Sequence, residues 1–99
     1  DQGIRARIIP VDYASHTGHV DTIEDQLDHV LNGVTTSTGT IPWLSTVTGE
    51  WIGPNTADGG YWFRNLRQTV QFDSTIRTLA DDGYRTFIEI SPHPVLTTA

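Results

Sequence analysis

The sequence contains no cysteine and no lysine. Without cysteine, neither a disulfide framework nor a thiolate metal site can form, so the fold depends on packing alone. All six basic side chains are arginines, and they stand against twelve carboxylates, which gives a formal net charge of −6. An acidic chain of this kind is poorly suited to nucleic acid or to an anionic membrane surface, so we expect neither as a partner.

Long apolar runs are also missing. No stretch approaches the roughly 20 apolar residues that a membrane-spanning helix requires. The N-terminal residues, which include Arg5 and Arg7, lack the apolar core of a signal peptide. We therefore expect a cytoplasmic protein.

With 99 residues the chain is at most one small domain with a modest core. Its first residue is Asp1, and the first expected element begins almost at once. Two expected strands of the buried type lie at opposite ends of the chain, with too few candidate strands between them to complete a sheet. We expect the chain to be a fragment of a larger domain.

The first half of the chain predicts a strand, a helix and a hairpin. Residues 4–12 alternate and then become continuously apolar, which favours a strand that enters a sheet. From 19 to 31 the apolar residues recur with helical spacing, and Gly33 follows as a stop signal. After a polar loop over 34–40, the β-favouring runs 41–47 and 50–52 predict a hairpin.

The second half predicts two helices and a final strand. Residues 61–66 favour a short helix, and a second helix is expected to be capped by Asp73 and Ser74 and to end at Gly83. Residues 84–91 have the composition of a buried strand. The order of elements predicts an α/β fold in which helices cover a sheet.

The run Tyr13-Ala14-Ser15-His16 is the strongest candidate for chemistry, because it lies where the first strand gives way to a helix. Histidine is the usual general base near neutral pH. An inert, hydrogen-bonded histidine at a helix start is an equally good interpretation. Ser15 is adjacent in sequence, so on a strand its side chain points away from His16 and cannot form a dyad with it.

No serine of the chain lies in a Gly-x-Ser-x-Gly turn, the motif that exposes a nucleophilic hydroxyl. The remaining serines are Ser37, Ser45, Ser74 and Ser91. A nucleophile for His16 must therefore come from elsewhere.

Three weaker patterns remain. His16 and His19, with Asp12 or Asp21, have spacing that a metal site could use, although short histidine pairs often arise by accident. In the aromatic run 61–63, we expect Trp62 to be a core residue and leave the role of Tyr61 open. The arginines either form a basic face or are scattered over the surface, and scatter is the simpler interpretation; they are Arg64, Arg67, Arg77 and Arg85.

Four ordered segments carry a resemblance to a known family. They are Val-Asp-Tyr-Ala-Ser-His at 11–16, Leu-Ser-Thr-Val-Thr-Gly-Glu at 44–50, Tyr-Trp-Phe-Arg-Asn-Leu-Arg-Gln-Thr-Val-Gln-Phe at 61–72 and Phe-Ile-Glu-Ile-Ser-Pro-His-Pro-Val-Leu at 87–96. In this order they resemble the C-terminal part of acyltransferase domains of modular type I polyketide synthases. The resemblance extends over essentially the whole chain.

The resemblance implies roles for four residues. His16 matches the family's general base, which acts on a serine that this chain lacks, and Asn65 matches a position whose backbone carbonyl orients the imidazole. Tyr13 and Ser15 match pocket positions associated with the choice of extender unit. The Tyr-Ala-Ser-His form resembles the methylmalonyl-selecting variant, whereas malonyl-selecting domains show His-Ala-Phe-His.

The resemblance also implies a fold and partners. Residues 1–10 would be the last strand of a small ferredoxin-like subdomain, and residues 11–99 would be part of a large, hydrolase-like subdomain with a parallel sheet. The implied reaction transfers a methylmalonyl or malonyl unit from CoA to the phosphopantetheine thiol of an acyl carrier protein in polyketide, often antibiotic, biosynthesis. The partners would be the N-terminal part of the same domain, the carrier protein and methylmalonyl-CoA, with no metal and no cofactor bound by this chain.

The isolated chain is expected to be inactive, since it lacks the nucleophile. A different class of function remains open. The chain could be a non-catalytic fragment that has a structural role or docks a carrier protein.

Overall fold

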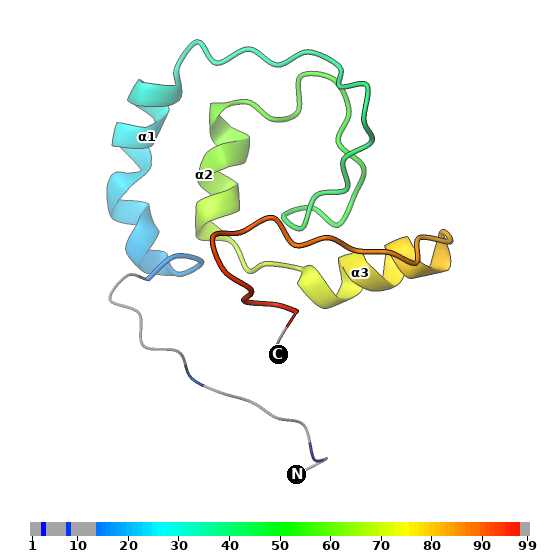
Figure 1. The fold of residues 1–99 in the computed structure, drawn as a ribbon. Coiled ribbons are helices and arrows are strands. Elements are labelled where there is room, and N and C mark those ends of the chain that lie inside the picture. The colour runs from blue at the N-terminus through cyan, green and yellow to red at the C-terminus, as the bar shows by residue number, and fades with distance from the viewer. Residues whose placement is uncertain (1–2, 4–7, 9–13, 98–99) are drawn as a thin grey trace.

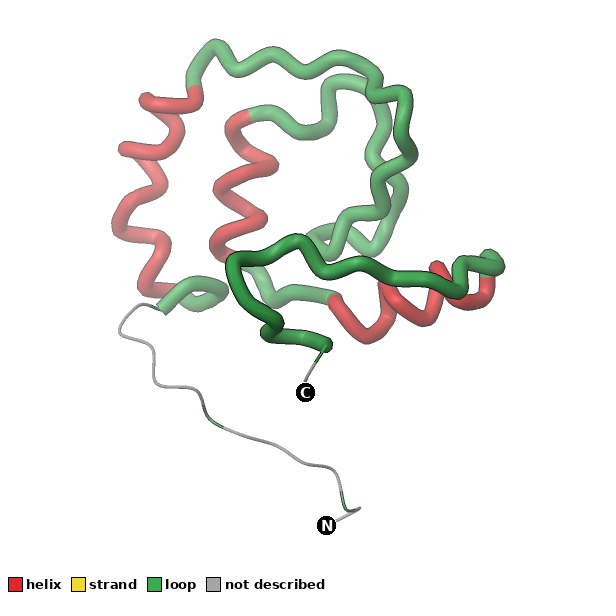
Figure 2. The backbone as a smooth tube through the Cα atoms, viewed as in Figure 1, coloured by secondary structure: helices red, strands yellow, loops and turns green. Residues whose placement is uncertain are grey.

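The computed structural model of the chain describes residue 3, residue 8 and residues 14–97. Its regular elements, in chain order, are the 3₁₀ helix η1 (Gly18–Ile23) and the α-helices α1 (Glu24–Leu31), α2 (Gly59–Arg67) and α3 (Phe72–Asp81) (Figure 1). Figure 2 shows loops joining these helices and no strand in the part of the chain that is described. None of the helices within that part is long and apolar enough to cross a membrane.

The helix predicted from 19 to 31 is present as η1 followed directly by α1. It starts where the Thr17 side chain accepts a hydrogen bond from the His19 amide, the usual capping contact. It ends before Gly33, whose φ of +93° is easily reached only by glycine. The strand predicted over 4–12 lies outside the described residues, apart from Ile8.

Helix α2 runs antiparallel to α1 at its side (Figure 1). The Asp58 side chain caps it by accepting a hydrogen bond from the Tyr61 amide at 2.9 Å. At the start of α2 the two backbones come close, because a Cβ atom added to Gly59 would lie 3.2 Å from Leu31 Cβ. The two helices therefore pack tightly where α1 ends and α2 begins.

Helix α3 begins at Phe72, one residue before its predicted cap. Asp73 lies inside the helix and pairs with Arg77, so the predicted capping role of Asp73 and Ser74 is wrong. The start is fixed by a tertiary contact instead, since the Gln71 amide donates to the Thr46 carbonyl at 2.8 Å. The predicted end at Gly83 is confirmed by a φ of +100°.

The predicted hairpin is reduced to one antiparallel bridge between Leu44 and Trp51. The bridge is flanked by a hydrogen bond from the Ser45 amide to the Glu50 carbonyl at 2.9 Å. Ser45 is fully buried, and its hydroxyl accepts from the amides of Val47 and Thr48. These two amides lie in the turn of the hairpin, where the Ser45 side chain satisfies them.

The small core forms around Tyr61, which is 1% exposed. Val47 and Ala57 are buried with it, and the Tyr61 hydroxyl shares a 2.8 Å hydrogen bond with the Ser45 hydroxyl. Trp62, which was predicted to be the core aromatic residue, is 40% exposed. It packs edge-on against Tyr61 and donates its indole N–H to the Ala57 carbonyl. A helix presents only one of two neighbouring residues to the core, and here that residue is Tyr61.

The buried strand predicted over 84–91 is absent. Within this segment Ile88 is 80% and Ile90 92% exposed, and no residue of it pairs with a described strand. The prediction of an α/β sheet is likewise not met by the described residues, whose regular elements are all helices. A β-strand requires a neighbouring strand for its backbone hydrogen bonds, and the segment finds none within 14–97.

The segment is instead fastened by the Glu89 carboxylate. This carboxylate accepts hydrogen bonds from the backbone amides of Val95, Leu96 and Thr97 and from the Ser91 hydroxyl, at 2.9 to 3.3 Å. The Val95 amide is the main cause that lowers the pKa of Glu89 from 4.5 to about 2, and the other donors act in the same direction. Glu89 thus closes the loop 91–97 back onto the extended segment.

We expect this loop to loosen in acid. Because folding lowers the pKa of Glu89, its stabilising contribution is present above pH 4.5 and is lost as the pH falls toward 2. Amide hydrogen exchange of Val95, Leu96 and Thr97 measures this loosening. The protection factors of these amides should fall between pH 5 and pH 2. The Glu89→Gln variant should show low protection at both pH values, whereas equal protection of the wild-type amides at both would contradict the assignment.

Candidate functional site

His16 lies in a turn that its own sequence does not favour. Its φ is +60°, in the left-handed region that residues other than glycine seldom adopt. The Thr17 hydroxyl, which donates to the Ala14 carbonyl at 2.8 Å, closes the turn locally. The His16 amide donates to the Leu66 carbonyl near the end of α2 at 2.7 Å. The strained conformation is therefore held by a contact with a segment 50 residues further along the chain.

The imidazole is oriented by the same end of α2. His16 Nδ1 lies 2.7 Å from the carbonyl oxygen of Gln68, the residue that follows the helix. A carbonyl oxygen can only accept, so Nδ1 carries the proton of this hydrogen bond. In the neutral ring the lone pair is then on Nε2, and no other atom within 14–97 bonds to the ring. The side chain is exposed, so Nε2 is available as a base toward an added group.

This contact corrects one prediction. The carbonyl that orients the imidazole belongs to Gln68, and not to Asn65, which lies inside α2. The last carbonyls of a helix have no partner within it, and the residue after its end is free to turn its carbonyl outward. Asn65 is also among the last four residues of α2, so the choice of Gln68 comes from how the His16 turn lies against the end of the helix.

No hydroxyl group within the described residues hydrogen-bonds to the His16 ring. Ser45 is buried against Tyr61, Ser74 donates to the Gln71 carbonyl, and Ser91 donates to Glu89 and to the His93 carbonyl. These three hydroxyls are thus engaged elsewhere. The described part of the chain presents a base with no nucleophile beside it.

Ser15 points into a separate hollow, which His16 does not line. The hollow has a volume of about 250 Å³ and a mostly apolar wall, formed by Ala14, Ser15, His19, Val20, Ile23 and Leu66. Ser15 is half-buried there. Tyr13, the other predicted pocket residue, lies outside the described residues.

The end of α2 makes one further contact with the turn. Arg67 Nε donates to Asp21 Oδ1 of η1 at 2.5 Å. Asp21, which the metal hypothesis placed beside His16 and His19, is thus paired with an arginine, and the described residues contain no group of three metal-ligating side chains. Asp12, the other carboxylate of that hypothesis, lies outside the described residues.

The arginines do not share one partner. Arg67 pairs with Asp21, Arg77 with Asp73, and Arg85 donates to the Ala80 and Tyr84 carbonyls. Each partner lies on a different element or turn. This distribution agrees with scattered surface arginines.

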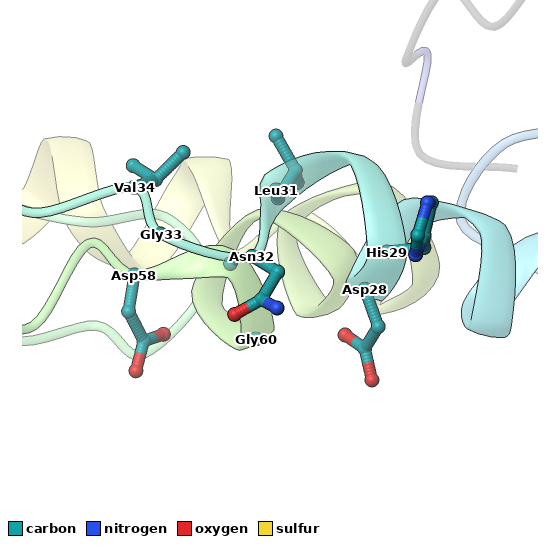
Figure 3. Close-up of a pocket in the computed structure, with 9 residues that line it drawn as sticks. Asp28, His29, Leu31, Asn32, Gly33, Val34, Asp58 and Gly60 are labelled. Atoms are coloured by element: carbon teal, nitrogen blue, oxygen red, sulfur yellow. The ribbon is translucent and has the colours of Figure 1, made fainter.

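A wider hollow of about 550 Å³ opens between the end of α1 and the start of α2 (Figure 3). Asp28, Asn32 and Asp58 extend toward the same side of it, whereas His29 extends away (Figure 3). Its lining contains no serine, threonine or cysteine. No hydrogen bond from the described residues orients the His29 ring there, whereas the Gln68 carbonyl orients that of His16, so the His16 turn is the better candidate for chemistry.

Sequence reasoning missed both the Gln68 carbonyl and the Arg67–Asp21 pair. The signal available for Gln68 was the end of a predicted helix, where unpaired carbonyls are expected. The sequence did not indicate that His16 donates to this carbonyl, because His16 and Gln68 are 52 residues apart.

Comparisons with known proteins give matches along the whole chain. The family model described as "Acyl transferase domain" matches residues 1–99. Polyketide synthase GfsE of Streptomyces halstedii is 56% identical over 96 residues, which are 97% of this chain and 2% of that protein. Pikromycin polyketide synthase component PikAII of Streptomyces venezuelae is 55% identical over 98 residues, which are 98% of this chain and 3% of that protein.

A solved structure has the same backbone arrangement. The acyltransferase domain from module 8 of the salinomycin polyketide synthase matches with a TM-score of 0.89 and 49% sequence identity, over 97% of this chain and 23% of that chain. The chain therefore spans a small part of the proteins that it matches.

Proposed function

Since the chain belongs to the acyl transferase domain family, in the branch found in modular polyketide synthases, we propose that it supplies the general base for acyl transfer onto an acyl carrier protein. His16 is that base. The observation that carries the proposal is the 2.7 Å contact between Nδ1 and the Gln68 carbonyl, which leaves the free lone pair of the neutral ring on Nε2. The nucleophile is a serine in a part of the domain outside this sequence.

The proposed reaction has two half-reactions. In the first, Nε2 of His16 takes the proton of the serine hydroxyl as its oxygen attacks the thioester carbonyl of the acyl-CoA, and the imidazolium returns the proton to the CoA sulfur that leaves. In the second, Nε2 takes the proton of the phosphopantetheine thiol as its sulfur attacks the acyl-serine, and the proton returns to the serine oxygen. His16 ends each half-reaction neutral, and no cofactor is consumed.

The group that orients His16 is a neutral carbonyl, where a serine hydrolase uses a carboxylate. A malonyl-type substrate itself carries a carboxylate. A second anion beside the imidazole would repel that substrate, whereas the Gln68 carbonyl fixes the tautomer with no added charge. We propose this as the reason for the neutral partner.

The proposed acyl group is methylmalonyl, and the proposed pocket residues are Tyr13 and Ser15. Ser15 is small and lies in an apolar hollow, so it leaves room for an α-methyl group. We expect Ser15→Phe to lower the preference for methylmalonyl-CoA over malonyl-CoA by roughly 10-fold to 100-fold, the range that one methyl group contributes in a pocket. Competition between the two CoA esters, with the loaded carrier protein weighed by mass spectrometry, measures the ratio.

A matched control is Ser74→Phe, because Ser74 is exposed on α3. This variant should keep the wild-type ratio. An unchanged ratio in Ser15→Phe would contradict the pocket assignment, and a wild-type domain that loads neither unit onto the carrier protein would contradict the proposed function itself.

The remaining proposals concern the setting of the chain. Residues 1–10 are proposed to end the small subdomain and residues 11–99 to form part of the large one. An apolar hollow of about 500 Å³, lined among others by Trp43, Trp51 and Phe87, supports a further partner, namely the rest of the same acyltransferase domain. By itself the chain is proposed to be inactive and, as part of a synthase, cytoplasmic.

A further inference from the structure

Three consecutive residues at the end of α2 contact the turn that carries His16. The Leu66 carbonyl accepts from the His16 amide at 2.7 Å, and the Gln68 carbonyl accepts from His16 Nδ1 at 2.7 Å. Between them, Arg67 Nε donates to Asp21 at 2.5 Å. Figure 1 shows this turn, in blue, beside the end of α2. Two of the three contacts hold His16 directly, and the third holds the helix that follows it.

We propose that Arg67 is a positioning residue for His16, which acts through Asp21. The pair fixes η1 against the end of α2 and thereby keeps the imidazole within hydrogen-bond distance of the Gln68 carbonyl. A contribution of Arg67 to catalysis rests on the proposed function. The positioning itself does not.

The two backbone carbonyls alone leave the turn free to pivot. Both accept from the same residue, so the line through them is an axis about which the rest of the turn can rotate. The Arg67–Asp21 contact lies five residues beyond His16 and off this axis. It therefore removes a motion that the histidine contacts do not restrain, and the left-handed backbone at His16 makes such a restraint necessary.

A second ion pair in the chain shows what a local contact looks like. Arg77 and Asp73 are four residues apart on α3, and their side chains are 74% and 80% exposed. Arg67 and Asp21 are 46 residues apart on different elements, and their side chains are 37% and 53% exposed. The guanidinium of Arg67 also lies beside Gly18, since a Cβ atom added there would lie 3.8 Å from Arg67 Nη2. The Arg77–Asp73 pair supports a single helix, whereas the Arg67–Asp21 pair joins two.

The test compares Arg67→Gln with Arg77→Gln in the acyltransferase domain that contains this sequence. A small misplacement of a catalytic group lowers the rate of the chemical step, so Arg67→Gln should lower kcat for transfer by about 10-fold to 100-fold. It should leave KM for methylmalonyl-CoA within about twofold, because the substrate pocket is untouched. Asp21→Asn should lower kcat to the same extent. The double variant, Arg67→Gln with Asp21→Asn, should have a kcat no lower than that of either single variant.

Arg67→Lys retains the positive charge and should restore part of kcat, whereas Arg77→Gln should match the wild type. Wild-type kcat in Arg67→Gln, or additive losses in the double variant, would overturn the proposal. A raised KM with kcat retained would also overturn the proposal, because this result would place Arg67 in substrate binding.

Proton NMR of the His16 ring supplies a readout that does not depend on activity. The Nδ1 proton that bonds to Gln68 should give a slowly exchanging signal in the wild type and in Arg77→Gln, and this signal should be lost in Arg67→Gln. A signal retained in Arg67→Gln would overturn the positioning role. A domain that fails to transfer the acyl group but loses the signal in Arg67→Gln would contradict the proposed function and leave the positioning role supported.

Discussion

Replacement of His16 by alanine is expected to slow transfer of the methylmalonyl group to the carrier protein by roughly 10²-fold to 10⁴-fold, the range that a positioned general base contributes. The variant removes Nε2, the acceptor that the Gln68 contact makes available. Both half-reactions should slow, because each needs the same base. Quenched-flow mass spectrometry of the carrier protein, in the domain that contains this sequence, measures the rate.

His29→Ala is the matched control. His29 is an exposed histidine in the last turn of α1 and lines a different hollow, so its loss should leave the rate within about twofold of the wild type. An unchanged rate in His16→Ala would remove the catalytic role and favour the inert histidine that the sequence also allowed.

Replacement of Tyr61 by alanine should have the largest effect on the folding of the chain. Tyr61 is 1% exposed, its ring lies edge-on to Trp43 and Trp62, and its hydroxyl bonds to the buried Ser45 hydroxyl. Removal of a buried aromatic ring costs about 3–5 kcal/mol of unfolding free energy, and here it also removes the partner of a buried polar group. Urea unfolding followed by tryptophan fluorescence measures the loss.

Two variants separate the causes. Tyr61→Phe keeps the ring but not the hydroxyl, so it should cost about 1–2 kcal/mol. Tyr84→Ala removes the same side chain from a position that is half-exposed, and it should cost less than Tyr61→Ala. Equal costs for Tyr61→Ala and Tyr84→Ala would contradict the assignment of Tyr61 as the centre of the core.

Local signals in the sequence predicted the helices well. The helical spacing up to Leu31 and the glycines at positions 33 and 83 predicted η1 and α1 and the end of α3, because these features depend on nearby residues. The start of α3 at Phe72 was missed, since it depends on the contact of Gln71 with Thr46, which is 25 residues away.

Strands were predicted less well, because a strand depends on its neighbours. The segment 84–91 has strand composition but finds no partner among the described residues, and it remains extended and exposed. The two segments of the hairpin around Gly49 meet in one bridge only, and the Ser45 hydroxyl accepts from two amides of the turn between them.

The candidate site could be predicted in part. The motif at 13–16 singled out His16, whose catalytic role stays a proposal, and the carbonyl next to its ring was assigned to Asn65, whereas the structure places that of Gln68 there. The choice between carbonyls three residues apart depends on where α2 ends and how the turn lies against it. The Arg67–Asp21 pair could not be predicted for the same reason, since the sequence around each of the two residues does not indicate the other.

Under the proposed function, this chain supplies the base of an acyltransferase, and the nucleophile lies outside residues 1–99. The most direct test incubates the domain that contains this sequence with methylmalonyl-CoA, stops the reaction, and locates the acyl group by peptide mapping in a mass spectrometer. One methylmalonyl group is expected, on a serine outside the 99 residues. An acyl group on a serine or histidine within them, or no acyl group at all, would contradict it.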